Sequence, residues 1–187
     1  MTLAQRSSRG ARVAARVPVS YSFSRAGTDD VDLLTEHRIA MYRAIRRFPP
    51  SIWPEHRRRY RRWLRSRLRT GAVVGYVVSG ADREPVASGL LWFQPTQPRP
   101  GAPQETTPYV FSMYTRQGHR GHGLATAIVA RLVRIARRRG YGRVVLHASV
   151  QGRSVYRKLG FQRTHEMRLI LRRAPGRASR AGRPNRS

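Results

Sequence analysis

Hydrophobic and polar residues follow two different periods along this chain, and the period predicts where strands and helices lie. Residues 19–24 alternate between apolar and polar side chains, as a strand does. Residues 72–79 and 86–93 are rich in β-branched and aromatic side chains, and the turn residues 80–82 between them predict a hairpin. Residues 109–115 predict a further strand of the same group.

Three longer segments carry apolar residues at the spacing of a helix. The first follows the capping residues 28–30 and runs to about Arg46, before a Phe-Pro-Pro sequence that ends it. The second begins at Ser51 and ends at Gly71, and it combines an apolar stripe with many arginines. The third is strongly amphipathic and runs to Arg139, where a glycine follows it.

The remaining segments complete a mixed architecture. Residues 95–108 are rich in proline and predict an irregular loop, which we expect at the rim of a site. Residues 143–148 predict a buried strand, residues 153–159 a short helix and residues 161–171 a last strand. The expected fold class is α/β, or α+β, with a mixed and mostly antiparallel central sheet of about six to seven strands and about four flanking helices.

Two terminal segments differ in composition from the rest. Residues 1–17 and 172–187 are rich in arginine and small residues and lack apolar periodicity, so we expect both basic segments to be disordered. One folded domain is expected between them, at residues 18–171.

The chain has a formal net charge of +29, from 38 basic and 9 acidic residues, and Lys158 is the only lysine among them. This excess favours association with nucleic acids or other polyanions, while a GC-rich coding sequence also explains an excess of arginine over lysine. The chain has no cysteine, which excludes disulfides and thiolate metal sites. No apolar run is long enough to span a membrane, so we expect a soluble, cytoplasmic protein.

Residues 120–125 read Arg-Gly-His-Gly-Leu-Ala and lie between a predicted strand and a predicted helix. The first turn of a helix has unpaired N–H groups at the positive end of its dipole, and glycines let an anion approach them closely. The segment therefore predicts a phosphate site, although glycines at such a turn can also serve turn geometry alone.

The same residues 120–125 resemble the Arg/Gln-x-x-Gly-x-Gly/Ala signature of the GNAT superfamily of N-acetyltransferases. Residues 156–161, Tyr-Arg-Lys-Leu-Gly-Phe, resemble the element that follows this signature in that family. The resemblance covers residues 19–171 and implies a GNAT-like fold whose sheet splays apart at the cofactor slot. A closer similarity, to a bacterial subgroup with mostly undefined substrates, runs through residues 146–149, 152–153 and 166–168.

The resemblance implies acetyl-CoA as acyl donor and no metal. The pyrophosphate would bind the backbone N–H groups of the 120–125 loop, and the pantetheine arm would pair with the strand before that loop. The strand at 143–148 should splay from it and open a slot for the thioester. Many family members carry asparagine where this chain has Ser149. The implied cofactor-binding residues are Met113, Tyr114, Thr115, Arg120, Gly121, His122, Gly123, Leu124, Ala125 and Ser149.

The resemblance further implies direct attack of an amine on the thioester. Tyr156 is the implied general acid for the departing thiolate, and its alternative role is an aromatic cover over the cofactor. No motif marks the general base. His119 and His122 lack the carboxylate or cysteine partners of a metal site, so we expect them beside phosphate instead. The candidate bases or substrate contacts are Glu36, His37, His147 and Glu166, of which His37 also fits a core position and Glu36 an arginine pair.

We therefore expect an N-acetyltransferase acting on a small-molecule amine. One alternative is a protein N-acetyltransferase, for example one acting on a chain terminus. A second is a catalytically inactive module on the same fold that binds nucleic acid or another polyanion. The expected partner is the amine substrate, and no membrane association is expected. Homodimer formation and non-specific association with polyanions are left open.

Overall fold

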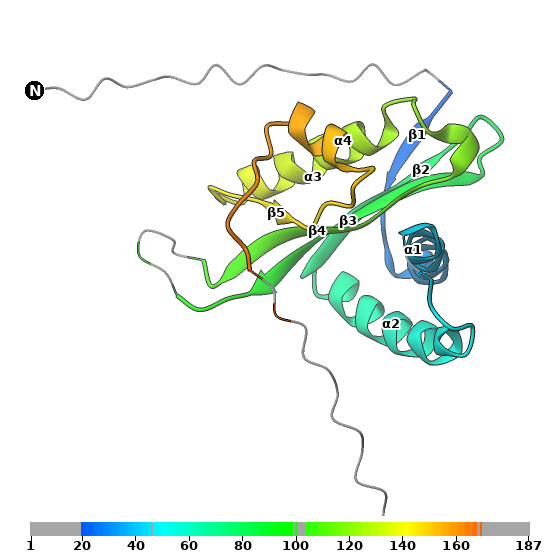
Figure 1. Cartoon of the computed structure of the whole chain (residues 1–187), viewed down its shortest axis with the longest axis horizontal. Coiled ribbons are helices and arrows are strands. Elements are labelled where there is room, and N and C mark those ends of the chain that lie inside the picture. The colour runs from blue at the N-terminus through cyan, green and yellow to red at the C-terminus, as the bar shows by residue number, and fades with distance from the viewer. Residues whose placement is uncertain (1–19, 46, 99, 101–103, 168, 170–187) are drawn as a thin grey trace, which may run out of the picture.

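The computed structural model describes residues 20–45, 47–98, 100, 104–167 and 169, which form a sheet with helices on both faces (Figure 1). The strands are β1 (Ser22–Arg25), β2 (Val73–Ser79), β3 (Pro85–Pro95), β4 (Thr106–Thr115) and β5 (Val145–Leu146). The helices are α1 (Val31–Ile45), α2 (Ile52–Arg69), α3 (Leu124–Arg138) and α4 (Arg153–Lys158), with short 3-10 turns η1 (Thr28–Asp30) and η2 (Gln117–His119). The two terminal segments predicted to be disordered lie outside the described residues.

The strands lie in the sheet in their chain order, from β1 to β5. The first three pairings are antiparallel, and β5 joins β4 in parallel. This topology confirms the mixed, mostly antiparallel sheet and the four flanking helices. The predicted number of strands was too high, because the described part of the chain contains five strands instead of six to seven.

The difference arises at the C-terminal end of the sheet. The predicted strand at 143–148 shrinks to the two residues of β5, and the described residues of the predicted strand at 161–171 are not in a strand. Two apolar side chains of this predicted strand are exposed to solvent, since Met167 is 95% and Leu169 82% exposed. A segment becomes a strand only where its backbone pairs with a neighbouring strand, and the described residues of this segment make no such pairing.

The predicted loop at 95–108 is shorter in the structure, because β4 already begins at Thr106 and includes Pro108. Pro108 lies opposite Phe93, whose backbone N–H donates to the Ala72 carbonyl on the other side of β3. The proline is therefore at a position where β4 makes no backbone bond to β3, and its missing N–H costs that pairing nothing.

The core has two layers, one on each face of the sheet. Alternate residues of β2 point into the two layers. Val73 and Val77 pack with α1 and α2, whereas Val74 and Val78 pack with α3. Both layers are buried, which explains why β2 reads as a continuous apolar run. Figure 1 shows α1 and α2 below the sheet and α3 and α4 above it.

A bulge interrupts the pairing of β3 with β4. Leu90 pairs with Phe111 and Ser88 with Tyr114, so Gly89 alone lies opposite two residues, Ser112 and Met113. Ser112 has a φ of 50°, in the left-handed region that serine seldom adopts. Gly89 gives the bulge its space, because a Cβ there would lie 2.4 Å from Met113 Sδ and 2.7 Å from Ile128 Cγ2.

The Gly89→Ala variant should lower the free energy of unfolding by about 2 kcal/mol, since the added methyl overpacks the α3 side of the bulge. Urea denaturation measures this change. The matched control is Gly142→Ala, because a Cβ at Gly142 meets nothing within 4 Å. Equal stability of the two variants would contradict a tight fit at Gly89.

Candidate active site

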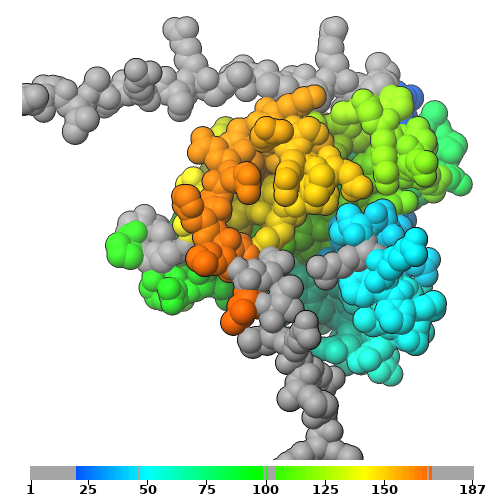
Figure 2. All heavy atoms as spheres, viewed as in Figure 1, coloured from blue at the N-terminus to red at the C-terminus, as the bar shows by residue number. Residues whose placement is uncertain are grey.

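A cavity of about 970 Å³ lies along β4, where the short β5 ends. In the space-filling view the gold and orange residues after β5 lie across from the blue and cyan residues of α1 and α2 (Figure 2). The lining residues come from both sides and from β4: Arg38, Met41, Tyr42, Ala44, Ile45, Tyr60, Trp63, Trp92, Tyr109, Val110, Phe111, Ser112, Met113, His147, Ala148, Ser149, Val150, Gln151 and Tyr156.

The cavity exists because the sheet separates at this edge. The parallel pairing joins only Tyr109 with Val145 and Val110 with Leu146. Beyond Leu146 the chain leaves the sheet, so residues 111–115 of β4 have β3 on one side and no strand on the other in the described chain. Their outward backbone N–H and C=O groups form an open edge that an extended ligand can join.

Side chains of α1 and α2 hold the bulge at the centre of the cavity. Arg38 Nη1 donates a hydrogen bond of 2.7 Å to Ser112 Oγ, and Tyr60 Oη lies 3.3 Å from the same oxygen. Ser112 and Tyr60 are both buried. These contacts support the left-handed backbone of Ser112, since strained conformations persist only where surrounding groups determine them.

The predicted phosphate loop leads from β4 into α3. Gly121 and Gly123 have φ angles of 84° and 75°, which glycine adopts without strain. The first N–H bonded within the helix is that of Ala127, which donates to the Gly123 carbonyl at 2.9 Å. The N–H groups of residues 124–126 precede it, and the first turn of α3 has no acidic side chain. A negatively charged group is favoured at this helix start.

Space and anchoring in this loop also fit a phosphate. A Cβ at Gly121 would meet nothing within 4 Å, and Arg120 and His122 are exposed. Arg120 Nε donates to the Thr115 carbonyl at 3.2 Å, which ties the loop to the end of β4. The loop and the open edge of β4 therefore adjoin, as a ligand carrying both a pyrophosphate and an extended arm requires.

Tyr156 on α4 contributes to the cavity wall. Burial, and to a smaller extent the nearby Tyr109, raises the pKa of its hydroxyl above the ordinary value of 10.0. Tyr156 therefore remains protonated through neutral and mildly alkaline pH and can act as a proton donor. A Cβ at Gly152 would lie 3.0 Å from Tyr156 Cε2, so the glycine lets the ring pack over the turn before α4.

His147, also in the cavity wall, connects two other polar groups. Its Nε2 lies 2.9 Å from both carboxylate oxygens of Glu166, and its Nδ1 lies 2.9 Å from Tyr109 Oη. A carboxylate only accepts hydrogen bonds, so the neutral imidazole donates from Nε2, and Nδ1 accepts from the tyrosine hydroxyl. The structure thus brings together two candidates from the sequence, His147 and Glu166, in an arrangement suited to proton uptake.

Comparison with known proteins identifies the family to which this chain belongs. Residues 38–161 match the model of the acetyltransferase (GNAT) family. The chain belongs to that family. The match confirms the resemblance found in the two sequence motifs.

Solved structures agree with this assignment. A GCN5-related N-acetyltransferase from Ralstonia eutropha is 28% identical, with a TM-score of 0.73, over 81% of this chain and 98% of that chain. A predicted acetyltransferase from Clostridium acetobutylicum, solved with acetyl-CoA, is 26% identical, with a TM-score of 0.73, over 80% of this chain and 95% of that chain. No curated protein matches the chain.

Ser149 of this acetyltransferase lines the cavity, and its hydroxyl is engaged locally. Ser149 Oγ accepts a hydrogen bond of 3.2 Å from the Gly152 N–H in the turn that precedes α4. The serine therefore stabilises the turn that precedes the helix of Tyr156.

The other two candidate bases lie outside the cavity lining. Glu36 accepts hydrogen bonds of 2.6 and 3.0 Å from Arg57, which lowers the pKa of its carboxyl group. His37 is buried, with Nδ1 2.9 Å from Ser88 Oγ, and its ring lies 4.5 Å from that of Tyr114. Burial lowers the pKa of His37 to about 4, so the ring is neutral at neutral pH and a weak base.

Sequence analysis did not single out Arg38, Tyr60 or Ser112. One signal was present, because Arg38 lies four residues after Leu34 and four before Tyr42, on the apolar side of its helix.

Within the described residues there is no group of three or more His, Cys, Asp or Glu that could hold a metal. None of the described helices is long and apolar enough to cross a membrane.

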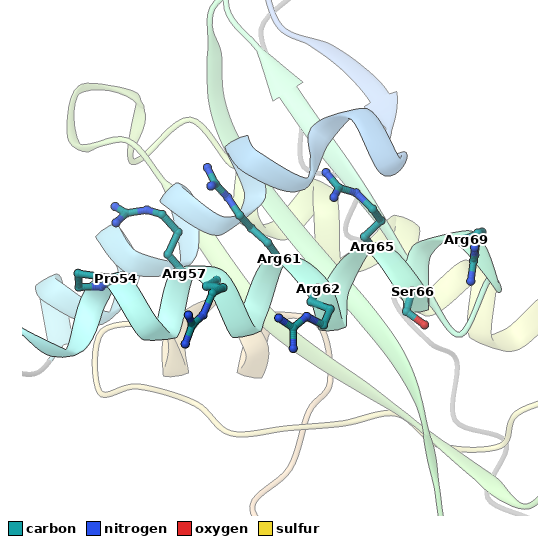
Figure 3. Close-up of a pocket in the computed structure, with 8 residues that line it drawn as sticks. Pro54, Arg57, Arg61, Arg62, Arg65, Ser66 and Arg69 are labelled. Atoms are coloured by element: carbon teal, nitrogen blue, oxygen red, sulfur yellow. The ribbon is translucent and has the colours of Figure 1, made fainter.

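A second hollow, of about 510 Å³, lies on the outer side of α2 (Figure 3). Six arginines line it, together with Pro54 and Ser66: Arg57, Arg58, Arg61, Arg62, Arg65 and Arg69. Arg57 and Arg61 pair with Glu36 and Asp32 of α1. The described residues that line the hollow include no acid and no histidine, so it can bind an anion but offers no general acid or base.

Proposed function

We propose that this acetyltransferase transfers the acetyl group of acetyl-CoA to the amine of a small molecule, by direct attack in a ternary complex. The observation that carries the proposal is that Tyr156 and His147 line one cavity beside the open edge of β4, and that His147 is hydrogen-bonded to Glu166. A proton donor and a proton acceptor are both required there. The coenzyme supplies the thioester as acyl donor.

The residues that fit the coenzyme are those of the loop and of β4. The N–H groups at the start of α3 and the open space at Gly121 suit the pyrophosphate. Met113 in the bulge and Tyr114 and Thr115 after it lie on the open edge and suit the extended arm. The backbone N–H at Met113 would donate to the acetyl carbonyl, as a fixed donor does for a developing oxyanion.

The proton balance assigns the side-chain roles. The acceptor reaches the cavity as an ammonium ion, and Nδ1 of His147 takes up its proton, directly or through the Tyr109 hydroxyl. The free amine attacks the thioester carbon, so that a C–N bond forms and the C–S bond breaks. The new amide nitrogen gives its surplus proton to the phenolate that remains at Tyr156 after the sulfur is protonated. Tyr156 donates its proton to the departing sulfur, and the chain has no cysteine thiol that could carry the acetyl group itself.

A thiol-release assay over a panel of amines tests this function. With each amine that serves as acceptor, the enzyme should release coenzyme A in step with the appearance of the N-acetylated product. Because the chain contains no cysteine, the enzyme contributes no background to a thiol reagent. Coenzyme binding without release above the amine-free rate, for every amine tested, would contradict the proposal.

The arginine-lined side of α2 favours polyanion binding as a second function of the same protein. Arg58, Arg62, Arg65 and Arg69 are exposed and make no ion pair with the described residues. Their spacing of three or four residues places them on one side of α2, and Figure 3 shows this side. A row of unpaired guanidinium groups suits the phosphates of a single-stranded nucleic acid.

Changing these four arginines to glutamine should weaken binding of single-stranded RNA by about tenfold at physiological salt. The slope of log K against the logarithm of the salt concentration should become shallower by about 3. Fluorescence anisotropy over a salt series measures both. The control changes four exposed arginines on the opposite side of the sheet, Arg134, Arg137, Arg138 and Arg143, to glutamine. Equal losses of RNA affinity in the two variants would show that the net charge of the protein, and not this side of α2, determines binding. Thiol release by the first variant should stay at the wild-type rate.

A further inference from the structure

Arg38 brings a positive charge to the cavity without a counter-ion. The residue is half-buried on α1 and lines the cavity. None of the ion pairs among the described residues involves it, and none of the described lining residues is Asp or Glu. A cation away from bulk water is costly unless a negative group compensates it. The cavity is therefore suited to a ligand that carries a negative charge.

The guanidinium of Arg38 is held in a fixed orientation. Its Cζ lies 4.8 Å from the ring centroid of Tyr42 and 4.6 Å from that of Tyr60. Its Nη1 donates to Ser112 Oγ and its Nη2 to Tyr42 Oη, at 2.7 and 2.8 Å. Each terminal nitrogen retains a second hydrogen, so a planar pair of donors remains for a carboxylate. Because the group is already ordered, little side-chain entropy is lost when the anion binds.

The rest of this part of the cavity is aromatic. The ring of Trp63 lies edge-on to Trp92, with centroids 5.2 Å apart, and edge-on to Phe111, at 5.9 Å. All three rings line the cavity, as does Tyr109. Such a wall favours a large apolar or aromatic group on the ligand. A polyamine would place further positive charge beside Arg38, which is unfavourable.

We propose that Arg38 binds the carboxylate of the acceptor, and that the acceptor is an amino acid with an aromatic or large apolar side chain. The inference rests on the proposed function, since it names the amine of that reaction. Arg38 donates to Ser112, which precedes Met113 in β4. The N–H of Met113 is the proposed donor to the acetyl carbonyl. The carboxylate must then lie close to the attacking nitrogen, as it does in an amino acid and not in a long-chain acid.

Equilibrium binding tests the inference without relying on turnover. Trp63 and Trp92 line the cavity, so their fluorescence should report ligands that enter it. The enzyme is saturated with coenzyme A, which has no acetyl group to transfer, and titrated with L-phenylalanine or L-phenylalaninamide. The two ligands share the same side chain, and the amide lacks the carboxylate. The wild-type enzyme should bind the acid about 30-fold more tightly than the amide.

The Arg38→Met variant should bind the two ligands with nearly equal affinity, and Arg38→Lys should retain part of the preference. The lysine variant keeps the experiment informative if the methionine variant does not fold. Arg43→Met is the matched control, because Arg43 lies on the same helix outside the cavity lining and should leave the preference unchanged.

Equal binding of acid and amide by the wild-type enzyme would overturn the inference, as would an unchanged preference in Arg38→Met. Tighter binding of the amide would also overturn it and favour a protein chain terminus as acceptor, because the amide resembles the first residue of a peptide. Thiol release is measured with the same two amines and acetyl-CoA. A preference for the acid in binding, without release from any amine of the panel, would overturn the proposed function and leave the carboxylate site standing.

Discussion

Replacing Tyr156 with phenylalanine should lower kcat by about 100-fold and leave the affinity for acetyl-CoA nearly unchanged. The substitution removes only the hydroxyl group, so the ring still fills its place between Gly152 and Phe161. Without a donor the thiolate must leave unprotonated or take its proton from water, and the transfer step slows. Steady-state kinetics with a verified amine and a separate coenzyme-binding titration measure the two quantities.

The pH dependence provides a second readout for Tyr156. A general acid works only while it is protonated, so activity that depends on Tyr156 should fall as pH rises through the pKa of its hydroxyl. Burial raises this pKa above 10.0, and the fall should therefore begin only at strongly alkaline pH. The Tyr156→Phe variant should lack this limb of the profile.

The control for Tyr156 is Tyr76→Phe, which removes a hydroxyl from a half-buried tyrosine of β2 outside the cavity lining. It should retain wild-type kinetics. A Tyr156→Phe enzyme with normal kcat but weaker coenzyme binding would contradict the role of general acid and support that of an aromatic cover over the cofactor.

The parts of this protein that sequence could predict are those fixed by local chemistry. The glycine-containing turn at residues 120–123 and α3 follow from glycines and an amphipathic run within a few residues of each other, and both appear at the expected positions. The overestimated last strand shows the opposite case. Its apolar residues suggested a strand, but a strand forms only by pairing with another strand, which depends on distant residues.

The centre of the cavity could not be read from sequence for the same reason. Ser112 adopts its left-handed backbone because Gly89 lies opposite it and because Arg38 and Tyr60 hold its hydroxyl. These four residues belong to β3, β4, α1 and α2, and no short motif contains them. Local motifs in the sequence therefore predicted the family and its acyl donor, whereas the residues that line the cavity beyond those motifs could be found only from the fold.

Replacing His147 with glutamine should lower kcat/KM for strongly basic amines by about 100-fold. The glutamine amide keeps a polar group near Tyr109 and Glu166 but cannot take up a proton. The loss should shrink for weakly basic amines, which enter largely as free bases and need no deprotonation. Measuring kcat/KM for a series of amines of graded basicity tests this dependence, and an equal loss for all acceptors would contradict the role of base.

Glu166→Gln should lower kcat/KM by about tenfold, since an amide no longer stabilises the imidazolium that forms at His147. If Glu166 acts only through His147, the double variant should be no slower than His147→Gln alone. The matched control is His165→Gln, the histidine next to Glu166, which is exposed and outside the cavity lining and should leave the rate unchanged. Additive losses in the double variant would mean that Glu166 acts independently, for example on the acceptor ammonium, and that the pair is not one proton-transfer unit.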